Sequence, residues 1–177
     1  DGTGAEDILN TGLSGPEGLM LDLSAGKIYW NEQPGAVLRR SNLDGTNMET
    51  LRTDLGSWVV QLTLDLDNGK VYWTQNGNRI RRCNLDGSNA ETILNVNYAY
   101  GIDLDRIGGK IYWAEANLSE IRRADLDGSN VTTVVTAGLQ TPRAIFVDSV
   151  NSKLYWTDLG ADVIQRSRRT GLRRCPQ

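Results

Sequence analysis

Lys27-Ile28-Tyr29-Trp30 is a short motif that returns along the chain, each time as a lysine, an aliphatic residue, a tyrosine and a tryptophan. The other copies are Lys70-Val71-Tyr72-Trp73, Lys110-Ile111-Tyr112-Trp113 and Lys153-Leu154-Tyr155-Trp156. The steps from tyrosine to tyrosine are 43, 40 and 43 residues. A period of this length predicts a repeat architecture, in which each unit buries its apolar face only against its neighbours.

Each unit has the pattern of short β-strands. Before the motif comes an alternating segment that ends in aspartate, as in Leu19 to Asp22, and a turn follows it. After the motif we expect a third strand around Leu38, Ile80, Ile121 or Ile164, an Asp-Gly turn in the first three units, and a fourth strand. The helical spacing i, i+3, i+4, i+7 is absent. Four antiparallel strands repeated about every 42 residues predict an all-β fold, a β-propeller of four blades.

The start of the chain resembles a fourth strand without a blade before it. Residues 1–13 align without a gap on residues 127–139, whereas the last unit has no clear fourth strand. We therefore expect residues 5–10 to pair with the strand that contains Ile164 and to close a four-bladed ring. Closure would also remove an exposed sheet edge. Residues 1–177 would form a single domain.

These units resemble the YWTD repeats, or class B repeats, of the low-density lipoprotein receptor family. Tyr155-Trp156-Thr157-Asp158 is a full match, and the downstream pattern Ile-x-Arg-x-x-Leu-Asp-Gly recurs at 80–87 and 121–128. Receptor propellers of this type have six blades and flanking growth-factor-like modules. With four units, the chain is identified as a small stand-alone relative, and the resemblance implies a module that binds protein ligands.

Composition excludes several classes of function. The formal net charge is −3, which argues against nucleic-acid binding, and no apolar run is long enough to insert into a membrane. The chain begins at Asp1 without a leader, as expected of a mature secreted protein. Two sequons, at Asn117 and Asn130, are about as many as chance gives.

The two cysteines, Cys83 and Cys175, are predicted on opposite sides of the ring. An internal disulfide would then be too long, so the thiols would stay free or join two chains in a dimer.

Most of the recurring residues are interpreted as structural. The motif tyrosine and tryptophan point to opposite faces of a strand, so each pair would pack against both neighbouring blades. Third-strand arginines are expected to pair with the repeated aspartates Asp22, Asp65, Asp105 and Asp148. Asp65 with Asp67 lacks the ligand spacing of a calcium loop. Without any histidine or assembled nucleophile, we expect no enzyme, cofactor or metal site.

Residues that vary at equivalent loop positions are the candidates for ligand binding. Loops that enter the first strand of a blade carry aromatic and charged residues: Glu17, Trp58, Tyr98, Tyr100 and Arg143. Loops between the second and third strands lie on the same side and carry Glu32, Gln75, Glu115 and Asp158. Aromatic rings beside carboxylates and amides are typical of a recognition face, although the rings could instead anchor the loops.

Two functions from different classes fit this face. A secreted lectin would use repeated sites for glycans or glycoproteins, stack sugars on Trp or Tyr, and gain avidity from multivalency. The alternative is a protein-binding propeller like those of the receptor family. We favour the lectin, because a solitary propeller has no evident tether for receptor work.

Overall fold

The computed structural model describes residues 3–56, 59, 61–75 and 77–168. All of its regular elements are strands, so the described residues contain no helix able to cross a membrane. The strands form three four-stranded sheets and one three-stranded sheet, which confirms the predicted all-β propeller of four blades.

The blades follow one another in chain order. Blade 1 consists of β1 (Pro16–Asp22), β2 (Lys27–Glu32), β3 (Val37–Asn42) and β4 (Glu49–Arg52). Blade 2 consists of β5 (Leu62–Asp65), β6 (Lys70–Gln75), β7 (Arg79–Asn84) and β8 (Glu91–Asn95). Blade 3 consists of β9 (Ala99–Asp105), β10 (Lys110–Glu115), β11 (Glu120–Asp125) and β12 (Thr132–Val135). Blade 4 consists of β13 (Pro142–Asp148), β14 (Lys153–Asp158) and β15 (Val163–Arg168).

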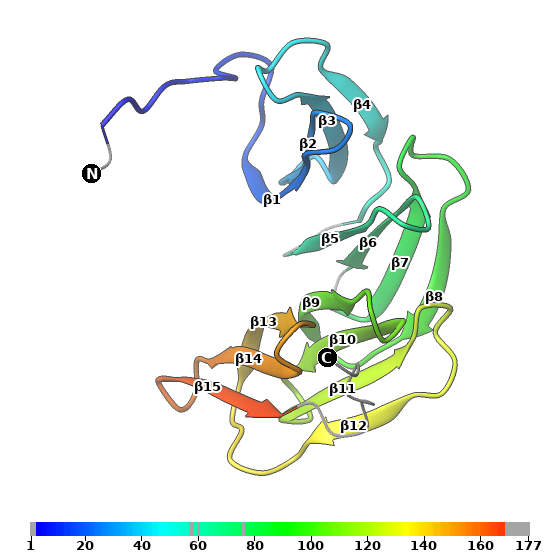
Figure 1. Cartoon of the computed structure of the whole chain (residues 1–177), viewed down its shortest axis with the longest axis vertical. Coiled ribbons are helices and arrows are strands. Elements are labelled where there is room, and N and C mark those ends of the chain that lie inside the picture. The colour runs from blue at the N-terminus through cyan, green and yellow to red at the C-terminus, as the bar shows by residue number, and fades with distance from the viewer. Residues whose placement is uncertain (1–2, 57–58, 60, 76, 169–177) are drawn as a thin grey trace.

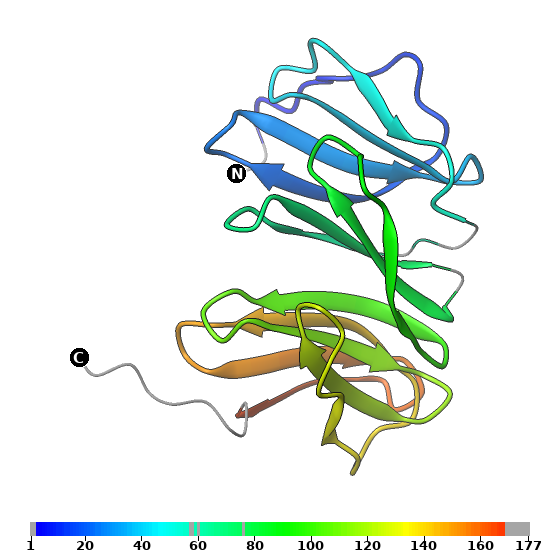
Figure 2. The same ribbon diagram turned by 90° about the vertical axis from the view of Figure 1, so that its right-hand side faces the viewer.

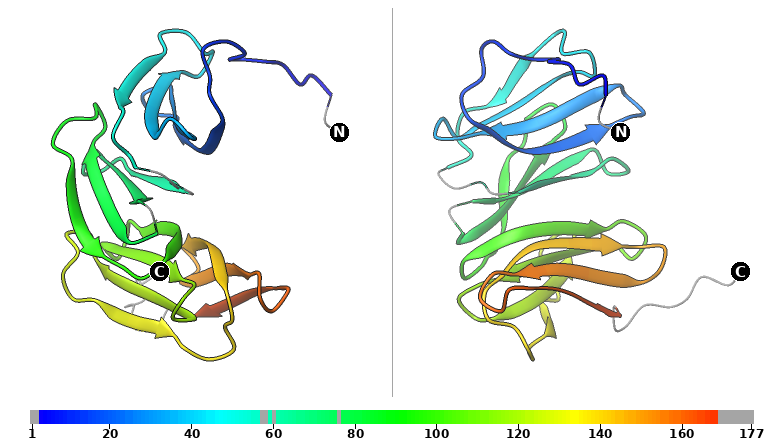
Figure 3. Two further views of the ribbon diagram at one scale, coloured as in Figure 1. Left: turned by 180° about the vertical axis from the view of Figure 1, so that it is seen from behind. Right: turned by 90° about the vertical axis from the view of Figure 1, so that its left-hand side faces the viewer.

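The four blades form an open arc, with the first strand of each blade on the concave side (Figure 1). The first strands contact one another in the order β1, β5, β9, β13. Side views show the blades one after another from blade 1 to blade 4 (Figures 2 and 3). The two end blades therefore each have a neighbour on one side within the described part of the chain.

The motif rings pack between blades as predicted. Tyr29 of blade 1 lies in one cluster with Trp73 of blade 2, and Tyr72 lies in the next with Trp113. A third cluster contains Tyr112 and Trp156. Each junction thus pairs the tyrosine of one blade with the tryptophan of the next, and these buried rings supply much of the apolar area that holds the arc together.

The expected pairing of arginines with the repeated aspartates is wrong. The aspartate that ends the first strand closes its own turn, because Asp22 accepts hydrogen bonds from the Ala25 N–H at 3.0 Å and from Ser24 Oγ at 2.6 Å. One third-strand arginine of blades 1 and 2 instead reaches the neighbouring fourth strand, as Arg40 does to Glu49 at 3.0 Å. A nearby turn N–H satisfies the carboxylate at lower entropic cost than a distant side chain.

Ring closure by the N-terminal segment is also wrong. Residues 5–10 form no strand, and β15 has β14 as its sheet partner. The segment lies on blade 1, where a methyl group added at Gly45 would strike the carbonyl of Ile8. In Figure 1 it extends away from the top of blade 1 and lies far from β15.

Cys83 is a free thiol in the core between blades 1 and 2. Burial raises its pKa to about 11. A fully buried thiol cannot bridge to a second chain, so the prediction that Cys83 could join two chains is wrong. Cys175 lies outside the described residues.

Candidate recognition face

Two sets of loops meet at one edge of blades 1, 3 and 4, as the sequence predicts. The backbone N–H of the loop between the second and third strands donates to the carbonyl of the residue that precedes the first strand. This bond runs from Gln33 to Gly15 at 2.8 Å, from Ala116 to Tyr98 at 3.1 Å and from Leu159 to Thr141 at 3.0 Å. The varying residues of both loop sets are therefore held on the same side of the propeller.

The acids and the amide of the second loop set are buried, and two of them, Glu115 and Asp158, accept backbone N–H groups of the loops. Glu32, Gln75, Glu115 and Asp158 are each less than a tenth exposed. Glu115 accepts the Asn97 N–H at 3.0 Å. Glu32 accepts the Trp30 ring N–H at 3.0 Å and pairs with Arg39. Glu115 and Asp158 satisfy loop donors, because a buried backbone N–H requires an acceptor, and none of the four side chains lies open to a ligand.

Asp158 is the clearest loop anchor. It accepts four backbone N–H groups, from Gln140 at 2.7 Å, Thr141 at 2.8 Å, Gly160 at 3.1 Å and Ala161 at 3.2 Å. Burial alone would raise the pKa of its carboxyl, but the donated hydrogen bonds lower it below its ordinary value. Asp158 therefore stays ionised and fixes the loops that carry neighbouring surface residues.

Tyr98, Tyr100 and Arg143 form a stacked row over blades 3 and 4. The Tyr98 and Tyr100 rings meet edge to face, with centroids 5.8 Å apart. The Arg143 guanidinium carbon lies 3.7 Å from the centroid of the Tyr100 ring. Half of Tyr98 is exposed, whereas Tyr100 and Arg143 are half-buried. This row brings together three of the predicted residues and presents a rigid cationic and aromatic surface.

The backbone of Tyr98 adds an unusual feature to this row. Its φ is +63°, which is a left-handed conformation. At the equivalent position blade 1 has a glycine, Gly15, with φ +64°. An aromatic residue in this region costs free energy, and such residues concentrate at functional sites. The sequence carries no signal for this strain, because φ depends on how the loop closes.

The other predicted residues lie apart from the row. Glu17 is exposed on β1 of blade 1, with blade 2 between it and Tyr98. Trp58 lies outside the described residues.

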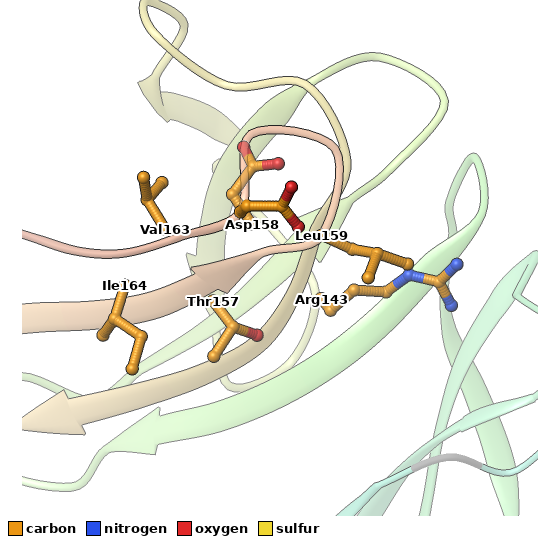
Figure 4. Close-up of a pocket in the computed structure, with 7 residues that line it drawn as sticks. Arg143, Thr157, Asp158, Leu159, Val163 and Ile164 are labelled. Atoms are coloured by element: carbon orange, nitrogen blue, oxygen red, sulfur yellow. The ribbon is translucent and has the colours of Figure 1, made fainter.

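A shallow hollow of about 480 Å³ lies beside the row, on blade 4. Its lining includes Arg143, Asp158, Leu159, Val163 and Ile164. In Figure 4 the Arg143 guanidinium points away from Val163 and Ile164, so the hollow has an apolar side on β15. Sequence reasoning missed Val163 and Ile164, although the absence of a fourth strand in this unit was a signal that β15 would be uncovered.

Chemistry other than binding has little support in the described residues. Among them, no group of three or more His, Cys, Asp or Glu side chains could hold a metal ion. The carboxylates of Glu32, Glu115 and Asp158 already bind loop N–H groups or arginines. The arrangement can bind a partner through stacking, cation–π contact and apolar contact.

Comparisons with known proteins match part of the chain to a known repeat family. The low-density lipoprotein receptor repeat class B matches residues 109–149, which form most of blade 3 and the start of blade 4. Nidogen of Drosophila melanogaster is 30% identical over 67 residues, which are 38% of this chain and 5% of that protein.

Solved structures extend the likeness to almost the whole chain. A chain in the crystal structure of a nidogen/laminin complex matches with a TM-score of 0.83 and 25% identity, over 92% of this chain and 64% of that one. A streptogramin B lyase structure matches with a TM-score of 0.73 and 18% identity, over 93% of this chain and 55% of that chain. The lyase likeness, at this identity, shows the fold alone.

Proposed function

We propose that this propeller, whose repeats belong to the low-density lipoprotein receptor class B family, is a non-enzymatic protein-binding module that works outside the cell. The likeness to nidogen supports a protein ligand, because the solved relative comes from a complex of two proteins. No comparable observation supports carbohydrate binding. The interpretation as a protein-binding module therefore replaces the lectin that the sequence alone favoured.

The row of Tyr98, Tyr100 and Arg143 is the observation that carries this proposal. Tyr and Arg are the residue types enriched where protein interfaces gain most of their energy. Arg143 is already stacked on Tyr100, and its Nε atom is buried without a hydrogen bond to another described residue. A ligand that contacts this row meets preordered side chains, so little conformational entropy is lost on binding.

The chemistry of the row suggests the kind of partner. A stacked guanidinium beside half-exposed phenol rings fits a protein segment that offers a carboxylate and an apolar side chain. Laminin is a first candidate, since it is the partner in the nidogen complex. We propose the row as the centre of the contact and the exposed Glu17 as a peripheral residue.

The test is binding of the intact chain to a panel of purified secreted proteins that includes laminin, in parallel with a glycan array. Tyr100→Ala and Arg143→Ala should weaken protein binding by roughly 10-fold or more, as for central interface residues. Ile107→Ala is the matched control, because Ile107 is exposed in the turn at the other end of β9.

Two results would contradict the proposal. The first is glycan binding that free sugar competes away, with no protein bound. The second is protein binding that Tyr100→Ala and Ile107→Ala change equally, which would move the site off the row.

A further inference from the structure

The recognition row, formed by Tyr98, Tyr100 and Arg143, crosses the junction between blades 3 and 4. The two tyrosines lie at the entry of blade 3, whereas Arg143 lies on the first strand of blade 4. The stack of the Arg143 guanidinium on the Tyr100 ring therefore joins two blades. Its geometry depends on how the first strands β9 and β13 are spaced, and these two strands contact each other directly.

A buried threonine of blade 2 fixes the backbone of Tyr100. Thr74 follows the motif tryptophan on β6 and is fully buried, and its Oγ1 donates a hydrogen bond to the Tyr100 carbonyl at 3.2 Å. Asn31 holds the same position in blade 1, and its Nδ2 donates to the Val59 carbonyl at 2.8 Å. In both blades this position ties down the entry of the next blade.

The entry of blade 4 must be placed in another way. At the position of Thr74, blade 3 has Ala114, whose side chain carries no donor. Arg143 is the counterpart of Tyr100, because each lies two residues before the isoleucine that faces a motif tryptophan. No side chain at the Thr74 position can therefore hold the Arg143 carbonyl.

A close backbone contact at Gly101 takes that role. A methyl group added there would lie 2.3 Å from the Arg143 carbonyl oxygen and 2.8 Å from the Ile145 nitrogen, so β9 and β13 meet main chain to main chain. The φ of Gly101 is not left-handed, so its own conformation does not require glycine. Blade 2 has Gln61 at the equivalent position, so the repeat does not require glycine either. The approach of blade 4 is what requires it.

This contact lies at the base of the stack. Gly101 follows Tyr100 in the chain, and the carbonyl that it meets belongs to Arg143 itself. Ordinary van der Waals contact with an alanine at this position would need the two strands to separate by about 1 Å. The guanidinium carbon lies only 3.7 Å from the ring centroid, so a movement of this size would open the stack.

We propose that Gly101 and Thr74 are positioning residues of the recognition row. Thr74 holds Tyr100 from blade 2, and Gly101 lets Arg143 approach from blade 4, so the stack is formed before any ligand arrives. A preformed stack spares the ligand the cost of ordering a long arginine side chain. The effect on ligand binding rests on the proposed function, whereas the effect on the stack does not.

The stack can be followed in the intact chain without a ligand. The ring current of Tyr100 displaces the NMR signal of the Arg143 Nε–H, and burial of Nε slows the exchange of this proton with water. Arg143→Lys identifies the signal by its loss, and Tyr100→Leu gives its position without the ring. Gly101→Ala should move the signal at least about halfway to that position.

Thr74 gives a second test that leaves the strand contact intact. Thr74→Val removes the hydroxyl and should move the Arg143 signal in the same direction but less far, because the Tyr100 carbonyl loses its donor. Thr74→Ser keeps the hydroxyl and should leave the signal in place. If Gly101→Ala does not fold, the Thr74 variants decide.

Gly128→Ala is the matched control. Its methyl group would also lie 2.3 Å from a carbonyl oxygen of another blade, that of Ile93, but at the other end of β11 from the recognition face. It should destabilise the chain and leave the Arg143 signal in place. Circular dichroism checks that each variant is folded. A signal that stays in place in folded Gly101→Ala or Thr74→Val, or that moves as far in Gly128→Ala, would overturn the proposal.

Binding to laminin, as the probe, separates this inference from the proposed function. Where the unmutated chain binds, Gly101→Ala and Thr74→Val should weaken binding by roughly 3- to 10-fold, and Thr74→Ser by less than about 2-fold. Unchanged affinity in a variant whose Arg143 signal has moved would contradict a role for the preformed stack in binding. An unmutated chain that binds no protein would contradict the proposed function, while the Arg143 signal would still decide whether Gly101 and Thr74 position the row.

Discussion

The inner junctions of this propeller and its fourth blade place equivalent residues in opposite environments. Ile121 of blade 3 is fully buried against blade 4, whereas Ile164, one repeat later, is 81% exposed. Their strands have the same register, because each isoleucine faces the second strand two positions after its motif tyrosine. The difference comes from the neighbour alone. In a repeat protein, a residue's contribution to stability is therefore a property of the junction rather than of the unit.

The largest expected effect is the contrast between these two isoleucines. Ile121→Ala should lower the free energy of unfolding by about 2 to 5 kcal/mol, because it leaves a cavity in the blade 3 and blade 4 cluster. Ile164→Ala should lower it by less than about 0.5 kcal/mol, because the Ile164 side chain is 81% exposed. Urea unfolding followed by tryptophan fluorescence at submicromolar protein measures both. Equal losses would contradict the difference in burial between the two side chains.

Glycines in the turns show the same contrast between a crowded and an open environment. Gly128 has φ +90°, and an added methyl group would strike the carbonyl of Ile93 in blade 2, whereas Gly109 has φ +63° and open space around it. We expect Gly109→Ala to cost about 1 kcal/mol from the left-handed conformation alone. Gly128→Ala should cost about 2 to 3 kcal/mol, since blade 2 must also shift.

Gly45→Ala is the informative comparison in the same unfolding experiment. Its methyl group would meet Ile8 on the N-terminal segment, which can move away without opening a blade junction. Its cost should therefore resemble that of Gly109→Ala. A loss as large as that of Gly128→Ala would show that the N-terminal segment is packed as firmly as an inner strand.

In this protein the sequence predicts the structure within one repeat better than it predicts which segments pack against one another. The period and the Tyr-Trp alternation predicted the blades and the inner junctions, because each depends on residues within one repeat and its copy. The same alignment marked residues 5–10 as a strand, but they form none, and it could not say which blade they lie against. It placed them on β15, whereas Ile8 lies over Gly45 of blade 1.

The candidate site shows a similar division. The loops and their common edge were predictable from strand order, and three of the predicted residues form the stacked row. Burial of Asp158 and Glu115 was not predictable, because it depends on which loop N–H groups lack a partner. The sequence suggested ligand contacts where the fold needs acceptors for its own backbone.

Asp158 offers a pH-dependent test of that anchoring role. Asp158→Asn should cost about 1 to 3 kcal/mol at pH 7, since one acceptor oxygen becomes a donor that faces N–H groups. The pKa of Asp158 is lowered in the folded state, so its contribution is fully present above the ordinary value of 3.8. It is lost as the pH falls through the lower folded value. The stability gap between the two proteins, measured by urea unfolding, should therefore close at acid pH.

Asp148→Asn is the control for this experiment. Asp148 ends the first strand of the same blade and accepts the Asn151 N–H at 2.9 Å, but it lies in a solvated turn. Its replacement should cost less than that of Asp158. A larger loss at Asp148 would contradict the anchoring role of the buried carboxylate.

The smallest expected effect separates the stability of the recognition row from its function. Tyr98 takes a left-handed conformation that Gly15 takes in blade 1. Tyr98→Gly removes that backbone cost of about 1 to 2 kcal/mol, but it loses the edge-to-face contact with Tyr100 and gains chain entropy on unfolding, about 1 kcal/mol each. The net change in unfolding free energy should lie within about 0.5 kcal/mol of zero. Tyr98→Ala keeps the strained conformation, so it should be less stable than Tyr98→Gly by about 1 kcal/mol. Both variants lack the ring, so both should weaken binding of the protein ligand to the same degree. If Tyr98→Gly retained full binding, the ring would serve only to close the loop, and recognition would rest on Tyr100 and Arg143.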